Sequence, residues 1–240
     1  MKIANRISLY SFLSFTFVIT ISLFFLYSIV KVNIEKLIYK DLERRTVEVE
    51  EHIERLLLSH KKKALVLAGN LLKQEFLKAI YDNKTIEAEK LGKQVNASLL
   101  KNVKEEINIY EIFILNNSGK IIASSDFNNI GLNKETDSYF LGAKEGPYIK
   151  DIYYSETLKE NIMAVAVPIK DSKINEFLGV LVFRVNLDDL YSILKVYVGS
   201  GKTDKVYLVN KYGYMITPSR FRKDTFLNQR INLSLKSKKS

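Results

Sequence analysis

Cysteine is absent from this sequence of 240 residues, so it can form neither a disulfide nor a thiolate metal site. Histidine is nearly absent too, with only His52 and His60. A histidine-based zinc site or a Ser-His-Asp triad would need one of them, and both lie in a strongly helical stretch. We therefore expect two histidines at a surface or a helix interface, no metal or other cofactor, and no enzyme.

Charged side chains are missing from residues 7–30, which are rich in Phe, Leu and Ile. About 20 apolar residues are enough to cross a bilayer as a helix. A cleaved signal peptide would have a shorter apolar core and small residues at its cleavage site, whereas this run ends in Tyr27-Ser28-Ile29-Val30. We predict a retained transmembrane helix at 7–30. Lys2 and Arg6 favour a cytoplasmic segment 1–6, which places the remainder outside the cell (inner) membrane of a single-pass protein.

The chain carries an excess of basic residues, since 37 Lys and Arg face 27 Asp and Glu for a net charge of +10. Nucleic acid is a partner that such a charge could serve. The predicted location and the even spread of the lysines argue against it. We interpret the excess as solubility together with attraction to an anionic membrane surface.

Helical periodicity follows the apolar run. Apolar residues recur three or four positions apart from Lys31 to about Gln74, without an interrupting proline. Asp82-Asn83 is a break, and Thr85 is expected to cap a second helix over about Ile86 to Glu105. Residues 31–105 are thus predicted to form a long helical stalk and a second helix. The stalk could pack on a twin helix in a homodimer or on the chain's own domain.

Strand periodicity begins after the second helix. A turn at residues 116–119 joins the first two predicted strands into a hairpin. A short helix is expected at Tyr139 to Ala143, and Asp188 is expected to cap another through Leu194. The predicted strands are 110–115, 120–124, 148–154, 162–169, 179–187, 206–210 and 214–217. This order predicts an α+β fold with an antiparallel sheet of about six strands.

Five segments in this order resemble the extracytoplasmic double Cache (dCache) domain of bacterial chemoreceptors and sensor histidine kinases. They read IFILNNSGKIIASS, SYFLGAKEG, YIKDIYYSETLKENIMAVAVPIKD, GVLVFRVNLDDLYSIL and KVYLVNKYGYMITPSR. The resemblance covers about residues 31–220, behind a transmembrane helix and a long helix. It implies a PAS-like sheet over 106–219 that holds a small ligand and passes a movement down the helices.

The amino-acid-binding subset of that family holds its ligand with an Arg-x-Trp-Tyr motif and a later Asp. Alignment of its pattern with this chain puts Tyr139 on the Trp, Asp137 on the Arg and Arg184 on the Asp. Both charges are reversed, and an α-amino acid held in the family's manner would meet like charges. The resemblance therefore implies a small anion or polar metabolite as the ligand.

We expect the ligand site on the sheet near Asp137, Tyr139, Tyr148, Asp151, Tyr153 and Arg184. Arginine on a pocket-facing strand grips a carboxylate or phosphate at two points. Val180 and Val182 share its face of the strand by alternation. An internal ion pair between Arg184 and Asp137, or an exposed edge arginine, is the alternative. The tyrosines suit an aromatic pocket wall, and ordinary strand formation is their alternative.

Complete members of the family continue into a second Cache module, a second transmembrane helix and an output domain. This sequence ends in a basic tail, 220–240, which we expect to begin a missing second module of a truncated receptor without its own output domain. A membrane-anchored scaffold or interaction protein is the alternative function. An envelope hydrolase using Asp151 and Glu156 as acid and base is a further one.

Overall fold

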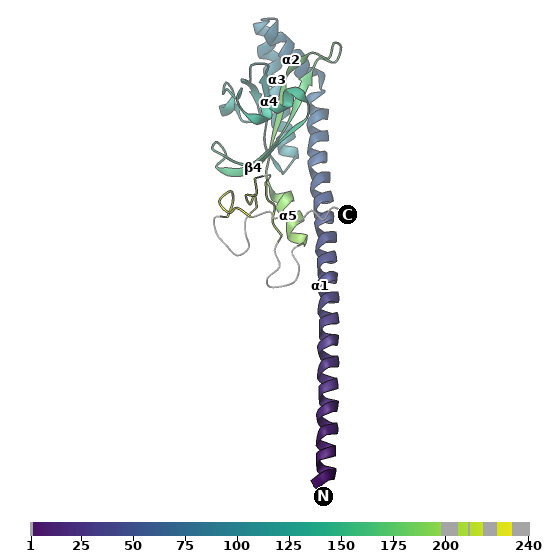
Figure 1. The fold of residues 1–240 in the computed structure, drawn as a ribbon. Helices are drawn as coiled ribbons and strands as arrows, with labels where there is room; N and C mark the ends of the chain where they lie inside the picture. The colour runs from purple at the N-terminus through teal and green to yellow at the C-terminus, as the bar shows by residue number, and fades with distance from the viewer. Residues whose placement is uncertain (1, 198–205, 211, 218–224, 232–240) are drawn as a thin grey trace. The chain divides into compact units, whose positions relative to one another are not determined.

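The computed structural model describes residues 2–197, 206–210, 212–217 and 225–231, and the chain divides into two compact units, 1–51 and 52–240. The greater part of the predicted basic tail lies outside the described ranges. Helix α1 runs from Lys2 to Ala68 (Figure 1). By length and composition it can cross a membrane, since its apolar window has a mean hydropathy of 2.2. Within that stretch, the hydroxyls of Thr20 and Ser22 donate to the carbonyls of Thr16 and Val18, each at 2.9 Å.

The predicted helix through Gln74 is interrupted at Gly69 and Asn70. Helix α2 (Leu71–Tyr81) begins there because the Asn70 side chain accepts from the backbone N–H of Leu72 at 2.9 Å. The apolar period continues across the break, which is why periodicity alone predicted a single helix.

The predicted break at Asp82-Asn83 is confirmed, since α2 ends at Tyr81 and α3 spans Thr85–Glu105. The two helices lie side by side (Figure 1). The predicted cap at Thr85 is wrong, because Lys84 holds the N-cap position without a side-chain hydrogen bond. Asp188 is likewise the first residue of its helix, α5 (Asp188–Tyr197), and its N–H donates to the Asn186 side chain at 3.2 Å.

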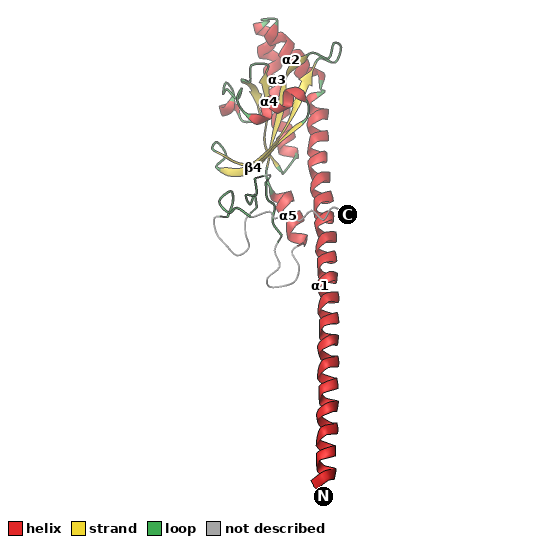
Figure 2. Ribbon diagram, in the orientation of Figure 1, coloured by secondary structure: helices red, strands yellow, loops and turns green. Residues whose placement is uncertain are grey.

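An antiparallel sheet follows (Figure 2), with the strands ordered β2-β1-β5-β4-β3. Its strands are β1 (Ile109–Asn116), β2 (Ile121–Ser124), β3 (Tyr148–Ser155), β4 (Glu160–Lys170) and β5 (Phe177–Val185). A 3-10 turn, η1 (Phe127–Asn129), and helix α4 (Ser138–Glu145) lie between β2 and β3. The α+β fold with an antiparallel sheet is confirmed.

The last predicted strand pair is not part of this sheet. Within the described residues, Val209 and Met215 form only an isolated bridge, flanked by a hydrogen bond from Ile216 N to Leu208 O at 2.9 Å. The side chain of Thr217 accepts from Leu208 N at 3.1 Å, which replaces one ladder bond. The sheet therefore has five strands, fewer than the sequence predicted.

Two hydrophobic cores lie on the two faces of the sheet. Leu181 and Phe183 of β5 join α2, α3 and the end of α1 in the larger core. Val180 and Val182 point the other way and pack with Tyr139 and with other residues of α4. The predicted alternation along β5 is confirmed, and it places Arg184 on the face that α4 covers.

Candidate functional site

Strand pairing sets a buried ion pair on the α4 face of the sheet. β1 and β5 are neighbours, and their register places Glu111 opposite Arg184. Arg184 Nη1 lies 3.0 Å from Glu111 Oε2, and the side chains are only 5% and 1% exposed. Thr157, in the turn between β3 and β4, accepts a second bond from the same nitrogen at 2.8 Å. Arg184 is thus neither an exposed edge residue nor the partner of Asp137.

Glu111 is surrounded by donors. Its Oε1 accepts from Ser124 Oγ at 2.7 Å and from Asn129 Nδ2 at 2.8 Å, in addition to the Arg184 bond at Oε2. A buried carboxylate needs this degree of pairing to stay ionised. The acid is consequently already satisfied by the protein.

A second ion pair joins α4 to β3. Asp137 accepts from the backbone N–H of Tyr139 at the start of α4, and Lys150 Nζ lies 2.8 Å from its Oδ1. Lys150 also stands over the rings of Tyr153, at 3.9 Å from the centroid, and Tyr139, at 5.2 Å. A lysine so placed is stabilised both by the carboxylate and by the ring faces.

The polar side chains around Arg184, Glu111 and Asp137 on the α4 face form one group, the Arg184 cluster. A β-bulge explains why Lys150 faces this cluster. The pairing runs from Lys150–Ala164 to Tyr153–Ile162, so three steps along β3 match two along β4. Lys150 and Tyr153 therefore share a face. Asp151 falls in the bulge, where it is exposed and accepts from Ile152 N at 2.8 Å.

Three buried polar atoms at the centre of the cluster have no hydrogen-bond partner among the described residues: the hydroxyls of Tyr139 and Tyr153 and the Nε of Arg184. Burial raises the pKa of Tyr153 to about 12 and raises the pKa of Tyr139 further, and nearby Asp137 acts in the same direction on both. The Arg184 guanidinium partly opposes this, although it donates to neither hydroxyl within hydrogen-bond geometry. Both phenols are neutral donors at physiological pH.

Of the predicted residues, Asp137, Tyr139, Tyr153 and Arg184 gather in this cluster. Tyr148 belongs to the same hydrophobic core, where its ring packs on Gly142 of α4 so closely that a Cβ there would lie 2.2 Å from it. Asp151 lies outside the cluster. Sequence reasoning did not include five further polar members: Glu111, Ser124, Asn129, Lys150 and Thr157.

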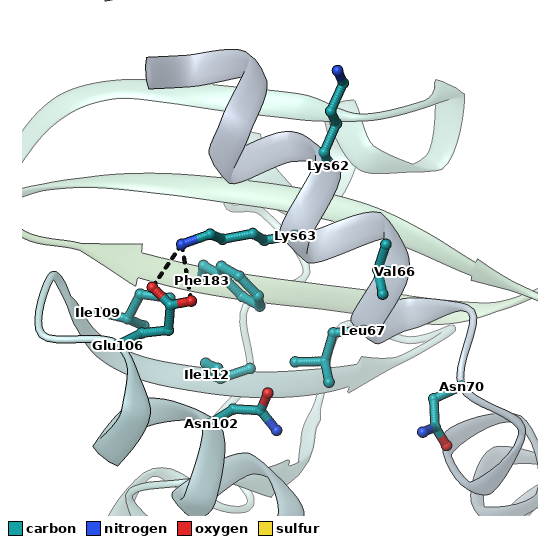
Figure 3. Close-up of a pocket in the computed structure, with 10 residues that line it drawn as sticks. All are labelled: Lys62, Lys63, Val66, Leu67, Asn70, Asn102, Glu106, Ile109, Ile112 and Phe183. Atoms are coloured by element: carbon teal, nitrogen blue, oxygen red, sulfur yellow. Dashed lines mark hydrogen bonds and ion pairs between the residues drawn. The ribbon is translucent and has the colours of Figure 1, made fainter. Parts of the chain in front are cut away.

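Two cavities of the unit 52–240 lie elsewhere, and none of the six predicted residues lines either. One, of about 430 Å³, lies between α1, α3 and the opposite face of the sheet (Figure 3). The other, of about 610 Å³, includes Gln74, Pro147 and Asp171 in its lining. Its Asp171 pairs with Lys78, which lowers the pKa of that carboxyl.

Signs of a catalytic or metal centre are weak in the part of the chain that the structure describes. His60 is buried, and His52 Nδ1 lies 2.9 Å from the hydroxyl of Tyr197, as expected of histidines at helix interfaces. The structure contains no metal-ligating group of three or more His, Cys, Asp or Glu within the described ranges. Asp151 and Glu156, the suggested acid and base, are both exposed, and Glu156 pairs with Lys159.

Comparison with known proteins gives the family. A family model described as the Cache domain, of the double Cache type, matches residues 31–238. The sensor domain of the histidine kinase DctB of V. cholerae is similar in structure, with a TM-score of 0.59 and 16% identity, over 74% of this chain and 65% of that chain. This chain therefore spans about two thirds of that domain.

A ligand-bound relative has the same fold. The ligand-binding domain of the Pseudomonas fluorescens chemoreceptor CtaA, in complex with L-serine, has a TM-score of 0.50 and 13% identity, over 75% of this chain and 70% of that chain. No curated protein sequence matches. The family match and the shared fold together show that this chain belongs to the Cache domain family and contains a sensor domain of the double Cache type.

Proposed function

We propose that this chain is a membrane-anchored sensory module that binds a small anion on the α4 face of its sheet. The observation that supports this most is the set of three unpartnered polar atoms, on Tyr139, Tyr153 and Arg184, within the described residues. A buried polar group without a partner costs about 1–3 kcal/mol. A ligand that accepts from all three removes that cost.

The charges favour an anion over an α-amino acid. The arginine Nε and the two hydroxyls are groups that donate. The two acids of the cluster are engaged: Glu111 by three donors, Asp137 by Lys150 and a backbone N–H. To pair with either acid, the ammonium group of an amino acid would have to displace one of these donors. A carboxylate or phosphate would instead add an acceptor.

A ligand screen tests the class of molecule. The full chain in lipid nanodiscs is heated with a panel of carboxylates, dicarboxylates, phosphate and standard amino acids, and the unfolding midpoint is recorded. We expect one or more anions to raise the midpoint and the amino acids to leave it unchanged. In Lys150→Gln the same anions should act more weakly, while Lys93→Gln, a surface control on α3, should behave as wild type. Stabilisation by ordinary amino acids alone would refute the proposed ligand class, and a panel in which no anion binds would favour a scaffold.

Membrane anchoring is the second part of the proposal, with residues from 31 onward outside the cytoplasm. The apolar part of α1 and the cysteine-free sequence make it testable. A single cysteine at exposed Asn117 should react with a membrane-impermeant maleimide in intact cells, and one at Asn5 should react only after lysis. The reverse pattern, or a mature N-terminus beyond Val30, would exclude this topology.

A homodimer is the expected assembly. In the described chain, Ile34, Leu37, Ile38 and Leu42 of α1 are each more than half exposed. Their spacing of three and four residues places them near one helix face, which suits a helix–helix seam. Crosslinking through Leu37→Cys in the membrane should trap a dimer. If neither Leu37→Cys nor a cysteine at a neighbouring position crosslinks, the proposed homodimer is refuted.

A further inference from the structure

The cavity of about 430 Å³ on the opposite face of the sheet is built differently from the Arg184 cluster. Ile109, Ile112 and Phe183 of the sheet and Leu67 of α1 give it apolar walls (Figure 3). Its volume falls in the range of small-molecule sites, about 300–1,000 Å³. The walls alone would suit any apolar molecule of that size.

Polar groups at the rim of the cavity narrow the class of ligand that it can bind. Lys63 Nζ contacts both carboxylate oxygens of Glu106, at 2.9 and 2.7 Å. Figure 3 shows Lys63 reaching across to Glu106, whereas the ammonium of the neighbouring Lys62 extends away from the other lining residues. The side chains of the pair are 45% and 39% exposed, so the pair contributes little stability and a ligand can replace one partner at small cost.

Two amide side chains of the lining each have a hydrogen bond at only one of their two polar atoms. Asn102 donates its nitrogen to the Ser98 carbonyl at 2.7 Å, and Asn70 accepts at its oxygen from Leu72 N at 2.9 Å. Within the described chain, this leaves the Asn102 oxygen and the Asn70 nitrogen for a ligand. The lining thus offers an apolar chamber with a cation and two amides along its edge.

We infer that this cavity is a second ligand site, for an amphipathic carboxylate. The apolar body would lie on Leu67, Ile112 and Phe183, and the carboxylate would take the place of Glu106 on Lys63. Two lysines and one glutamate line the cavity, for a net charge of +1; Lys63 makes the ionic contact, whereas Lys62 points away and adds only a weak, screened preference for an anion. An amine would instead compete with Lys63 for the single acid and meet two like charges.

Occupation of this site would add a contact between elements that already meet in the larger core. The lining comes from the last turns of α1, the start of α2, the end of α3 and strands β1 and β5. A bound carboxylate therefore contacts α1 and the sheet at once, on the face away from Arg184. Its binding stabilises the packing of that part of α1 on the sheet.

Octanoate is a suitable probe, with octanol as the uncharged molecule of equal chain length. Binding to the full chain in nanodiscs is measured by titration calorimetry, after subtraction of empty nanodiscs. We expect saturable binding of octanoate, and binding on the order of tenfold weaker in Lys63→Gln because one charge-assisted contact is lost. Lys62→Gln, next to it on the same helix, should change the affinity by less than about twofold, given its direction in Figure 3 and the screening of exposed charge.

A variant with the opposite expected effect on octanoate affinity separates an effect on binding from an effect on folding. Glu106→Gln breaks the same ion pair as Lys63→Gln, yet it frees Lys63 for the ligand and should tighten octanoate binding. Weaker binding in both variants would mean that the pair acts only on the fold and would overturn the inference. So would octanol binding as tightly as octanoate, an equal loss in Lys62→Gln, or the absence of saturable binding beyond that of empty nanodiscs.

Discussion

The buried pair of Glu111 and Arg184 gives a prediction that depends directly on the described geometry. Removal of one partner from a buried ion pair leaves an unpaired charge and costs about 3–5 kcal/mol. Glu111→Leu removes the acceptor of three donors, from Arg184, Ser124 and Asn129. We expect the free energy of unfolding to fall by about 3–5 kcal/mol.

The complementary change should cost less. In Arg184→Met, Glu111 keeps its bonds from Ser124 and Asn129, so its charge remains partly compensated. The loss should be close to that of one charge-assisted hydrogen bond, about 1.5–3 kcal/mol. The double variant should lose less than the sum of the single ones by about 1–3 kcal/mol, because the second change removes a charge that the first left unpaired.

Urea unfolding of the full chain in nanodiscs measures these values, followed by far-UV circular dichroism and by the fluorescence of the 14 tyrosines. Lys93→Met is the control, since its ion pair with Glu89 is exposed and should not change the unfolding midpoint. Additive single effects, or a Glu111→Leu variant as stable as this control, would mean that the pair is not desolvated and would refute the reasoning.

Three other changes test the packing and the charge of the fold. Gly142→Ala would place a Cβ 2.2 Å from the Tyr148 ring and should cost about 1–3 kcal/mol in chemical denaturation, whereas Gly146→Ala, with open space at its Cβ, should be tolerated. Asn70→Ala removes the N-cap of α2 and should lower stability by about 1 kcal/mol; an unchanged unfolding midpoint would contradict the capping role. Burial lowers the pKa of Lys73 to about 8 from 10.5, so the unfolded chain binds the extra proton between these values and stability should rise from about pH 8 to 10. A Lys73→Met variant should lose that rise, and a wild-type chain that weakens over this range would show that Lys73 is not buried as described.

Local patterns predicted the elements of the fold well. The helical period over α1 and α3 and the alternation along β1 and β5 depend on residues close in sequence, and each matched an observed element within a few residues. Alternation also predicted the face on which Arg184 lies. The break at Gly69-Asn70 was missed because the apolar period continues through it and only the capping asparagine signals it.

The candidate site was harder to predict because its contacts are non-local. The partner of Arg184 follows from the pairing of β1 with β5, which joins residues 73 positions apart. Glu111 did carry a signal, as the single charge inside a run of apolar strand residues. Lys150 carried none, because strict alternation puts Tyr153 and Asp151 on one face and only the bulge in β3 exchanges Asp151 for Lys150.

The central claim, a ligand site completed by an anion at the α4 face, is tested most directly by removing two of its unpartnered donors. Tyr139→Phe combined with Tyr153→Phe deletes only the buried hydroxyls that lack partners in the described chain. Without ligand, the unfolding midpoint should rise or stay the same, because the cost of an unsatisfied group, about 1–3 kcal/mol, is relieved. The upward shift caused by the most stabilising anion should shrink or vanish in the same variant. A variant that is less stable without ligand yet still binds that anion as wild type does would contradict the account.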